Sequence, residues 1–184
     1  MRKEAELIKL SDDQITILRN ILGERVYFFY ANKLQVEGSN GRYAFWADEF
    51  AVAFSAVNHS SEKFRTYINI SADYKLSNNS TSTYYEFKIN ESSAPLWQEG
   101  SLQFGRLSSI KIFSDPILMV EIYQGYCEES EKSILHDCAM VFYSQRGKFL
   151  LQARQALIGG VDVVLDEAYI DVLVKDWKLR YTLV

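Results

Sequence analysis

The one local cluster that could carry chemistry is His136-Asp137-Cys138, which sets a base, an acid and a nucleophile side by side. In an extended strand His136 and Cys138 share a face, because successive side chains alternate. Nucleophilic attack needs the thiol and the imidazole at hydrogen-bond distance, whereas strand side chains two residues apart stand roughly parallel. We therefore expect no catalytic role. The sequence predicts that His136 and Asp137 end a loop and that Cys138 begins a buried strand.

Other catalytic and metal-binding patterns are missing from the sequence. The chain has no glycine-rich phosphate loop, no Gly-x-Ser-x-Gly and no His-Glu-x-x-His. His59 and His136 are its two histidines, too few for an ordinary zinc site, and Cys127 and Cys138 form no Cys-x-x-Cys pair. We expect two free thiols, no metal, no cofactor and no enzymatic activity.

Carboxylates gather in two places. One group surrounds Ser130 and the other lies near the C-terminus; their members are Glu128, Glu129 and Glu131, and Asp162, Asp166, Glu167, Asp171 and Asp176. Clustered charge steers encounter with an oppositely charged protein, so both groups are candidates for docking a basic protein partner. Charge runs are also common on solvated faces, and carboxylates favour a helix N-terminus for helix energetics alone. Both interpretations stay open.

Several tyrosines fall opposite the inferred apolar faces or at strand starts, namely Tyr27, Tyr43, Tyr67 and Tyr84. Exposed aromatic side chains are common at binding surfaces. The same residues could pack beneath a helix or a second sheet. The sequence alone does not decide whether aromatic or acidic residues form a binding surface.

Composition places the chain among folded, strand-rich proteins. It has 184 residues, 48% hydrophobic and 14% aromatic, which fits a single domain over 1–184. Its net charge of -4 and its pI near 5.3 argue against nucleic acid and anionic lipid as partners. No apolar run reaches the length of a membrane span and no secretory signal is evident, so we expect a cytoplasmic protein without membrane contact.

Two amphipathic helices are predicted near residues 11–22 and 166–177. Ser11 and Gln14 form a capping box ahead of apolar residues at helical spacing, and Gly23 ends the pattern. Asp166 caps the second helix, which is followed by a terminal strand over residues 179–183. We expect both helices to cover the same sheet face.

Alternating patterns predict strands over most of the remaining chain. Long strands are expected at 26–36 and 42–57, joined by a hairpin, with a bulge at Asp48-Glu49 in the second. Further hairpins are expected around Pro116 and around Gly147. The predicted fold is α+β, a mostly antiparallel sheet or a partly closed barrel of about eight or nine strands with an N-terminal and a C-terminal helix.

Two functions fit this chain. The first is that of a non-catalytic protein-binding domain. A concrete example is a cytoplasmic protein of the immunity type, which neutralises a toxin-like partner. The alternative is a domain that binds a small-molecule or lipid-like ligand in an aromatic-lined cavity between layers. For the first, Asp171 is predicted to be exposed and to be the cleanest position for a charge-reversal test, because it lies away from the apolar stripe of its helix.

Overall fold

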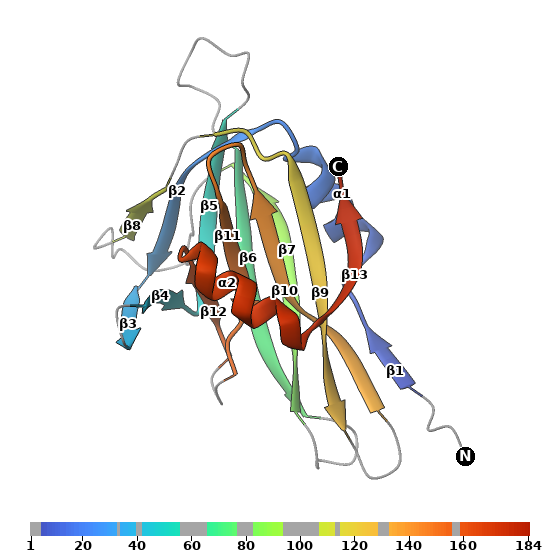
Figure 1. The fold of residues 1–184 in the computed structure, drawn as a ribbon. Coiled ribbons are helices and arrows are strands. Elements are labelled where there is room, and N and C mark those ends of the chain that lie inside the picture. Colours follow the sequence, from blue (N-terminus) through green and yellow to red (C-terminus); the bar gives the residue numbers. More distant parts are fainter. Residues whose placement is uncertain are drawn as a thin grey trace, which may run out of the picture.

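Two β-sheets make up most of this computed structural model (Figure 1). The structure describes residues 5–32, 34–39, 42–55, 66–76, 83–93, 107–112, 115–128, 133–155 and 159–184. The α+β class and the mostly antiparallel pairing agree with the sequence prediction. Over the strands that the structure describes, neither sheet closes on itself, so the barrel alternative is not observed there.

The larger sheet, sheet A, contains eight strands among the described residues. Its order is β13 (Lys178–Leu183), β9 (Met119–Glu128), β10 (Ser133–Tyr143), β11 (Lys148–Ala153), β12 (Val161–Val164), β4 (Arg42–Ala47) and β3 (Gln35–Ser39). The eighth strand, β1 (Ala5–Ile8), runs parallel to the first half of β10. The predicted hairpin around Gly147 is confirmed as β10–β11, and the predicted terminal strand is confirmed as β13 on β9.

The smaller sheet, sheet B, is formed in the described part of the chain by five antiparallel strands. Its order is β7 (Thr83–Ser92), β6 (Thr66–Leu76), β5 (Glu49–Ser55), β2 (Arg25–Asn32) and β8 (Leu107–Lys111). Because β8 belongs to sheet B and β9 to sheet A, the hairpin predicted around Pro116 is wrong.

The two longest predicted strands are each divided between the sheets. Residues 26–36 supply β2 of sheet B and the start of β3 of sheet A, and residues 42–57 supply β4 and β5. Where a bulge was expected, Asp48 forms the bend between sheets. Alternation persists through such a bend, because both pieces bury side chains in the same core. The β3–β4 hairpin itself is confirmed.

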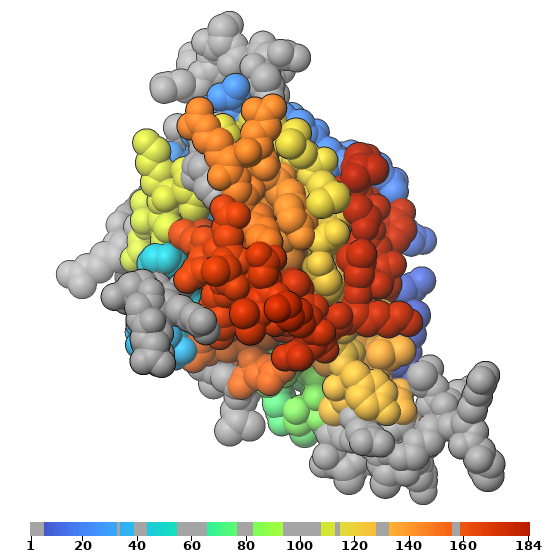
Figure 2. Space-filling view, in the orientation of Figure 1, coloured from blue at the N-terminus to red at the C-terminus, as the bar shows by residue number. Residues whose placement is uncertain are grey.

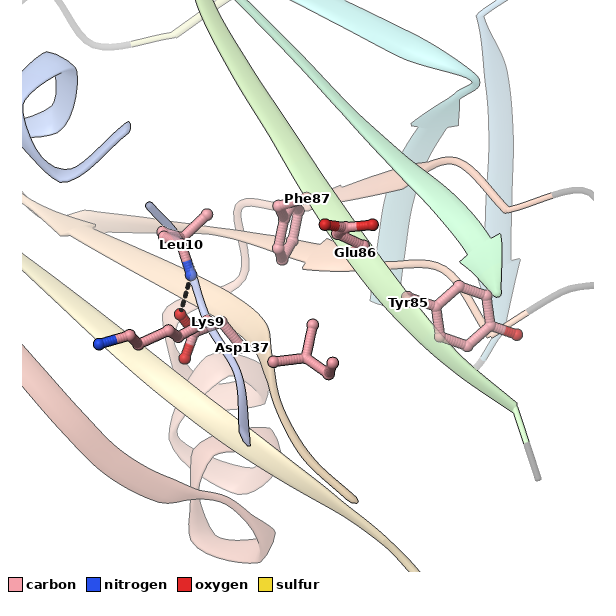
Figure 3. Close-up of a pocket in the computed structure, with 7 residues that line it drawn as sticks. Lys9, Leu10, Tyr85, Glu86, Phe87 and Asp137 are labelled. Atoms are coloured by element: carbon pink, nitrogen blue, oxygen red, sulfur yellow. Dashed lines mark hydrogen bonds between the residues drawn. The ribbon is translucent and has the colours of Figure 1, made fainter. Parts of the chain in front are cut away.

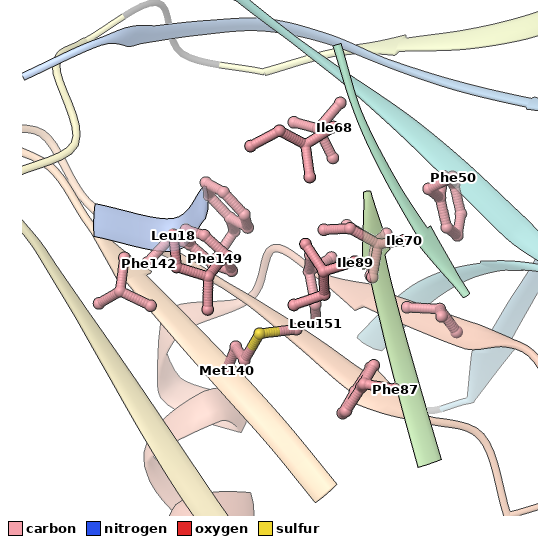
Figure 4. Close-up of a cluster of buried hydrophobic side chains, with 14 of the residues drawn as sticks. Leu18, Phe50, Ile68, Ile70, Phe87, Ile89, Met140, Phe142, Phe149 and Leu151 are labelled. Atoms are coloured by element: carbon pink, nitrogen blue, oxygen red, sulfur yellow. The ribbon is translucent and has the colours of Figure 1, made fainter. Parts of the chain in front are cut away.

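Aromatic and branched side chains of both sheets pack against one another in one cluster (Figure 4). Phe149 stacks on Phe142 with ring centroids 4.7 Å apart and meets Phe29 edge-on at 5.3 Å. All three side chains are at most 1% exposed. These three rings are in direct contact in the core between the two sheets.

The two helices lie in different places, so the prediction that they cover one sheet face is wrong. Helix α1 (Asp12–Asn20) has the predicted capping box at Ser11 and Gln14, buries Leu18 in the main core, and lies against β7. The Gln14 side-chain amide donates to the backbone oxygen of Phe87 at 3.0 Å, which occupies part of the β7 edge. An edge covered in this way is less available for pairing with another chain.

Helix α2 (Glu167–Leu173) crosses the outer face of sheet A and continues as a 3₁₀ turn, η1 (Val174–Asp176) (Figure 1). It is shorter than predicted, although Asp166 caps it as expected. Ile170 is fully buried in a second cluster that contains Val141, Leu150 and Val164 of the sheet. Among the described residues, no helix has the length and apolar character needed to cross a membrane.

Candidate functional site

The His136-Asp137-Cys138 cluster lies inside strand β10, so the prediction that His136 and Asp137 end a loop is wrong. All three residues are buried. The pairing of β10 with β9 shifts register between Asp137 and Ala139, which places a bulge at Cys138. The sequence did not indicate that these polar residues are buried inside a strand, because their burial depends on partners that are distant along the chain.

Asp137 joins three parts of the chain. Its carboxylate accepts a hydrogen bond from the backbone nitrogen of Leu10 at 2.7 Å (Figure 3) and two from the Arg180 guanidinium, through Nε and Nη2, at 2.7 Å each. A buried carboxylate is stable only when it is paired and hydrogen-bonded. The Asp137 clamp, formed by Leu10, Asp137 and Arg180, therefore ties the segment after β1 and strand β13 to β10.

The electrostatic setting of His136 and Cys138 disfavours thiolate chemistry. Burial lowers the pKa of His136, which keeps the imidazole neutral. Burial, reinforced by the Asp137 charge, raises the pKa of the Cys138 thiol to about 12. A thiol that stays protonated and an imidazole that stays neutral form no activated nucleophile at neutral pH.

A small hollow lies between the Asp137 clamp and strand β7 (Figure 3). Its lining includes Lys9, Leu10, Glu86 and Asp137, and its volume is about 10 Å³. That is room for roughly one water molecule. In the described part of the chain, no three His, Cys, Asp or Glu side chains lie close enough together to hold a metal ion.

The two cysteines should differ sharply in reactivity. Cys127 is partly exposed, whereas Cys138 is 7% exposed and has a raised pKa. We expect native protein at pH 8 to react rapidly with about one equivalent of Ellman's reagent, and Cys138 to react only after unfolding. Mass mapping of the modified peptides identifies the residue. Equal, rapid modification of both thiols would refute this placement of Cys138.

Of the acidic residues near the C-terminus that were predicted as a binding surface, two make hydrogen bonds within the fold. Asp162 is 8% exposed and accepts hydrogen bonds from Arg154 and Gln152, each at 2.9 Å, so it is not part of an exposed acidic surface. Asp166 accepts from the backbone nitrogen of Tyr169 at 3.0 Å as the α2 cap. In the other predicted acidic group, Glu129 and Glu131 lie outside the described residues, and so does the side chain of Glu128.

The remaining acidic residues form an exposed surface on α2 and η1. Lys175 is exposed in the α2–η1 stretch, so the charge there is mixed. Glu167, Asp171 and Asp176 are exposed, and Val172, which lies between Asp171 and Asp176 in the sequence, is 46% exposed. We call these four residues the α2 surface. Asp171 is exposed as predicted, yet it forms an ion pair with Lys148, which the sequence did not indicate. Replacing Asp171 with lysine would oppose two ammonium groups, so Asp171 is not the cleanest charge-reversal position.

Comparisons of the chain with protein-family models, with curated proteins and with solved structures found no significant match.

Proposed function

We propose that this chain is a non-catalytic protein-binding domain, of the kind that neutralises a basic, toxin-like partner, and that it docks this partner on the α2 surface. The observation that carries the proposal is the exposed combination of Glu167, Asp171 and Asp176 with the half-exposed Val172. Carboxylates at the rim of an interface steer a basic protein, and an apolar centre supplies desolvation energy.

The α2 surface is also held firmly, which favours binding because little conformational entropy is lost. Ile170 is fully buried beneath the helix, and the Asp166 side chain caps its first turn. Lys148 ties Asp171 to the start of β11. Acidic side chains on a rigid support present a fixed charge pattern to a partner.

Ligand binding in an internal cavity has less support. In the described part of the core, the rings of Phe29, Phe142 and Phe149 pack directly on one another, and the hollow beside Asp137 holds about 10 Å³. Ligand pockets are typically larger by more than an order of magnitude.

Affinity capture with paired charge variants tests the proposal. Asp176 is exposed and forms no ion pair with another described residue, and lysine near a helical C-terminus is favourable, so Asp176→Lys should fold normally. Glu91→Lys, at an exposed position near the end of β7 in sheet B, is the matched control. We expect the unmodified chain and Glu91→Lys to retain one basic protein in stoichiometric amount from native lysate, and Asp176→Lys to retain clearly less. Recovery of background proteins alone would count against the proposal.

A further inference from the structure

Beside α2, the outer face of sheet A carries two tyrosines that share one carboxylate. The hydroxyls of Tyr123 and Tyr143 both donate to Oε2 of Glu121, at 2.7 Å and 2.6 Å. In Figure 2, atoms of β9, β10 and β11 stay visible beside α2, so the helix covers only part of this face. We call Glu121, Tyr123, Tyr143 and Asp171 the tyrosine shelf.

The carboxylate of Glu121 can accept further hydrogen bonds. Its Oε1 accepts no hydrogen bond from the described residues and is not among their buried unpaired atoms, whereas Oε2 takes both tyrosine hydroxyls. Burial and the bond to Glu121 raise the pKa of Tyr123 to about 12, and the same two causes raise that of Tyr143. Both rings therefore stay neutral and keep their hydroxyl protons directed at Glu121.

The shelf already holds one cation of the chain itself. Lys148 Nζ lies 5.7 Å from the centre of the Tyr143 ring and pairs with Asp171. This contact shows that an aromatic face and a carboxylate here can receive a cation together. Among these described groups, Glu121 and Asp171 carry two negative charges and Lys148 one positive charge. Within this set of described groups, the negative charges exceed the positive charge by one.

We propose that the tyrosine shelf is the anchor point of the basic partner and that it receives an arginine side chain. This rests on the proposed function, since it names the group by which that partner is held. A guanidinium can lie on the Tyr143 ring while it donates to Glu121 Oε1, and arginine and tyrosine are both enriched at the energetic centres of interfaces. A lysine ammonium lacks the planar face that stacks on the ring.

The test uses a capped tri-arginine peptide as the probe and tyrosine-ring carbon NMR as the readout. We expect saturable shifts of the Tyr123 and Tyr143 signals with the arginine peptide, weaker shifts with a capped tri-lysine peptide and none with a tri-glutamate peptide. Glu121→Gln keeps an acceptor for the tyrosines but removes the charge, and should weaken arginine binding by roughly tenfold. Glu91→Gln, remote on β7, should leave the affinity unchanged.

A second variant should change the affinity for the arginine peptide in the opposite direction. Misfolding of Glu121→Gln alone could not produce that pair of results. Lys148→Met removes the competing cation and should strengthen binding of the arginine peptide. The shelf proposal is overturned if Glu121→Gln and Lys148→Met both leave arginine binding unchanged, or if Asp176→Asn alone weakens it. The latter result would leave the α2 surface as the docking site. Failure of the capture experiment with arginine binding at the shelf intact would instead count against the proposed function.

Discussion

Replacing Arg180 with methionine should lower the free energy of unfolding by about 3 to 5 kcal/mol, because it strands the Asp137 carboxylate in the interior without its cation. The two side chains are 19% and 3% exposed, and they share two hydrogen bonds of 2.7 Å. The same change removes the side-chain link between β13 and β10, while β13 stays paired with β9 and Asp137 still accepts from Leu10. Urea denaturation monitored by circular dichroism measures the loss.

The matched control is the ion pair between Lys88 and Asp73 on the outside of sheet B. Its side chains are 54% and 38% exposed, so Lys88→Met should change the free energy of unfolding by at most about 1 kcal/mol. If Arg180→Met proves as mild as Lys88→Met, the Asp137 clamp does not hold the strands together as described.

Truncating Phe149 to alanine should cost about 3 to 5 kcal/mol of unfolding free energy. The ring is fully buried between Phe142, on which it stacks, and Phe29, which it meets edge-on. Its removal opens a cavity where strands of both sheets meet. Thermal unfolding followed by calorimetry gives the change in stability.

Tyr126→Ala serves as the control for loss of an aromatic ring without loss of core packing, because Tyr126 is 58% exposed. Its expected cost is within about 1 kcal/mol. A small effect of Phe149→Ala, comparable to that of Tyr126→Ala, would mean that the space between the sheets is not packed as the structure shows.

Local signals made the helices and several strands predictable. The capping box at Ser11 and Gln14 and the cap at Asp166 each depend on residues within one turn, and both form. Alternation is equally local: Tyr85, Phe87 and Ile89 recur at every second position of β7, and all three are buried. The turn before Gly147 correctly joined β10 to β11.

The assignment of strands to two sheets could not be read in the same way. The pattern across Asp48 stays extended while the chain leaves one sheet for the other, because alternation reports burial and not the identity of the neighbouring strand. The predicted count of about eight or nine strands was low for this reason: the described residues contain thirteen.

The candidate site was predictable only in part. The acidic residues of α2 were indicated by composition, and Asp171 is exposed as expected. The partners of Asp137 lie 43 and 127 residues away along the chain, and the tyrosine that shares Glu121 with Tyr123 lies 22 residues from that carboxylate. Periodicity contains no information about such pairs, so the sequence did not indicate the tyrosine shelf. Of the tyrosines that it did indicate, Tyr27, Tyr67 and Tyr84 are half-buried, and the side chain of Tyr43 lies outside the described residues.

The most direct test of protein binding through the α2 surface is the association rate of the captured partner, measured by stopped flow across a range of ionic strength. The proposed function predicts a rate that falls as salt screens the carboxylates, and a slower rate for Asp176→Lys at low salt, with thermal stability unchanged and Glu91→Lys behaving like the unmodified chain. A rate that is independent of salt and identical in all three proteins would contradict it.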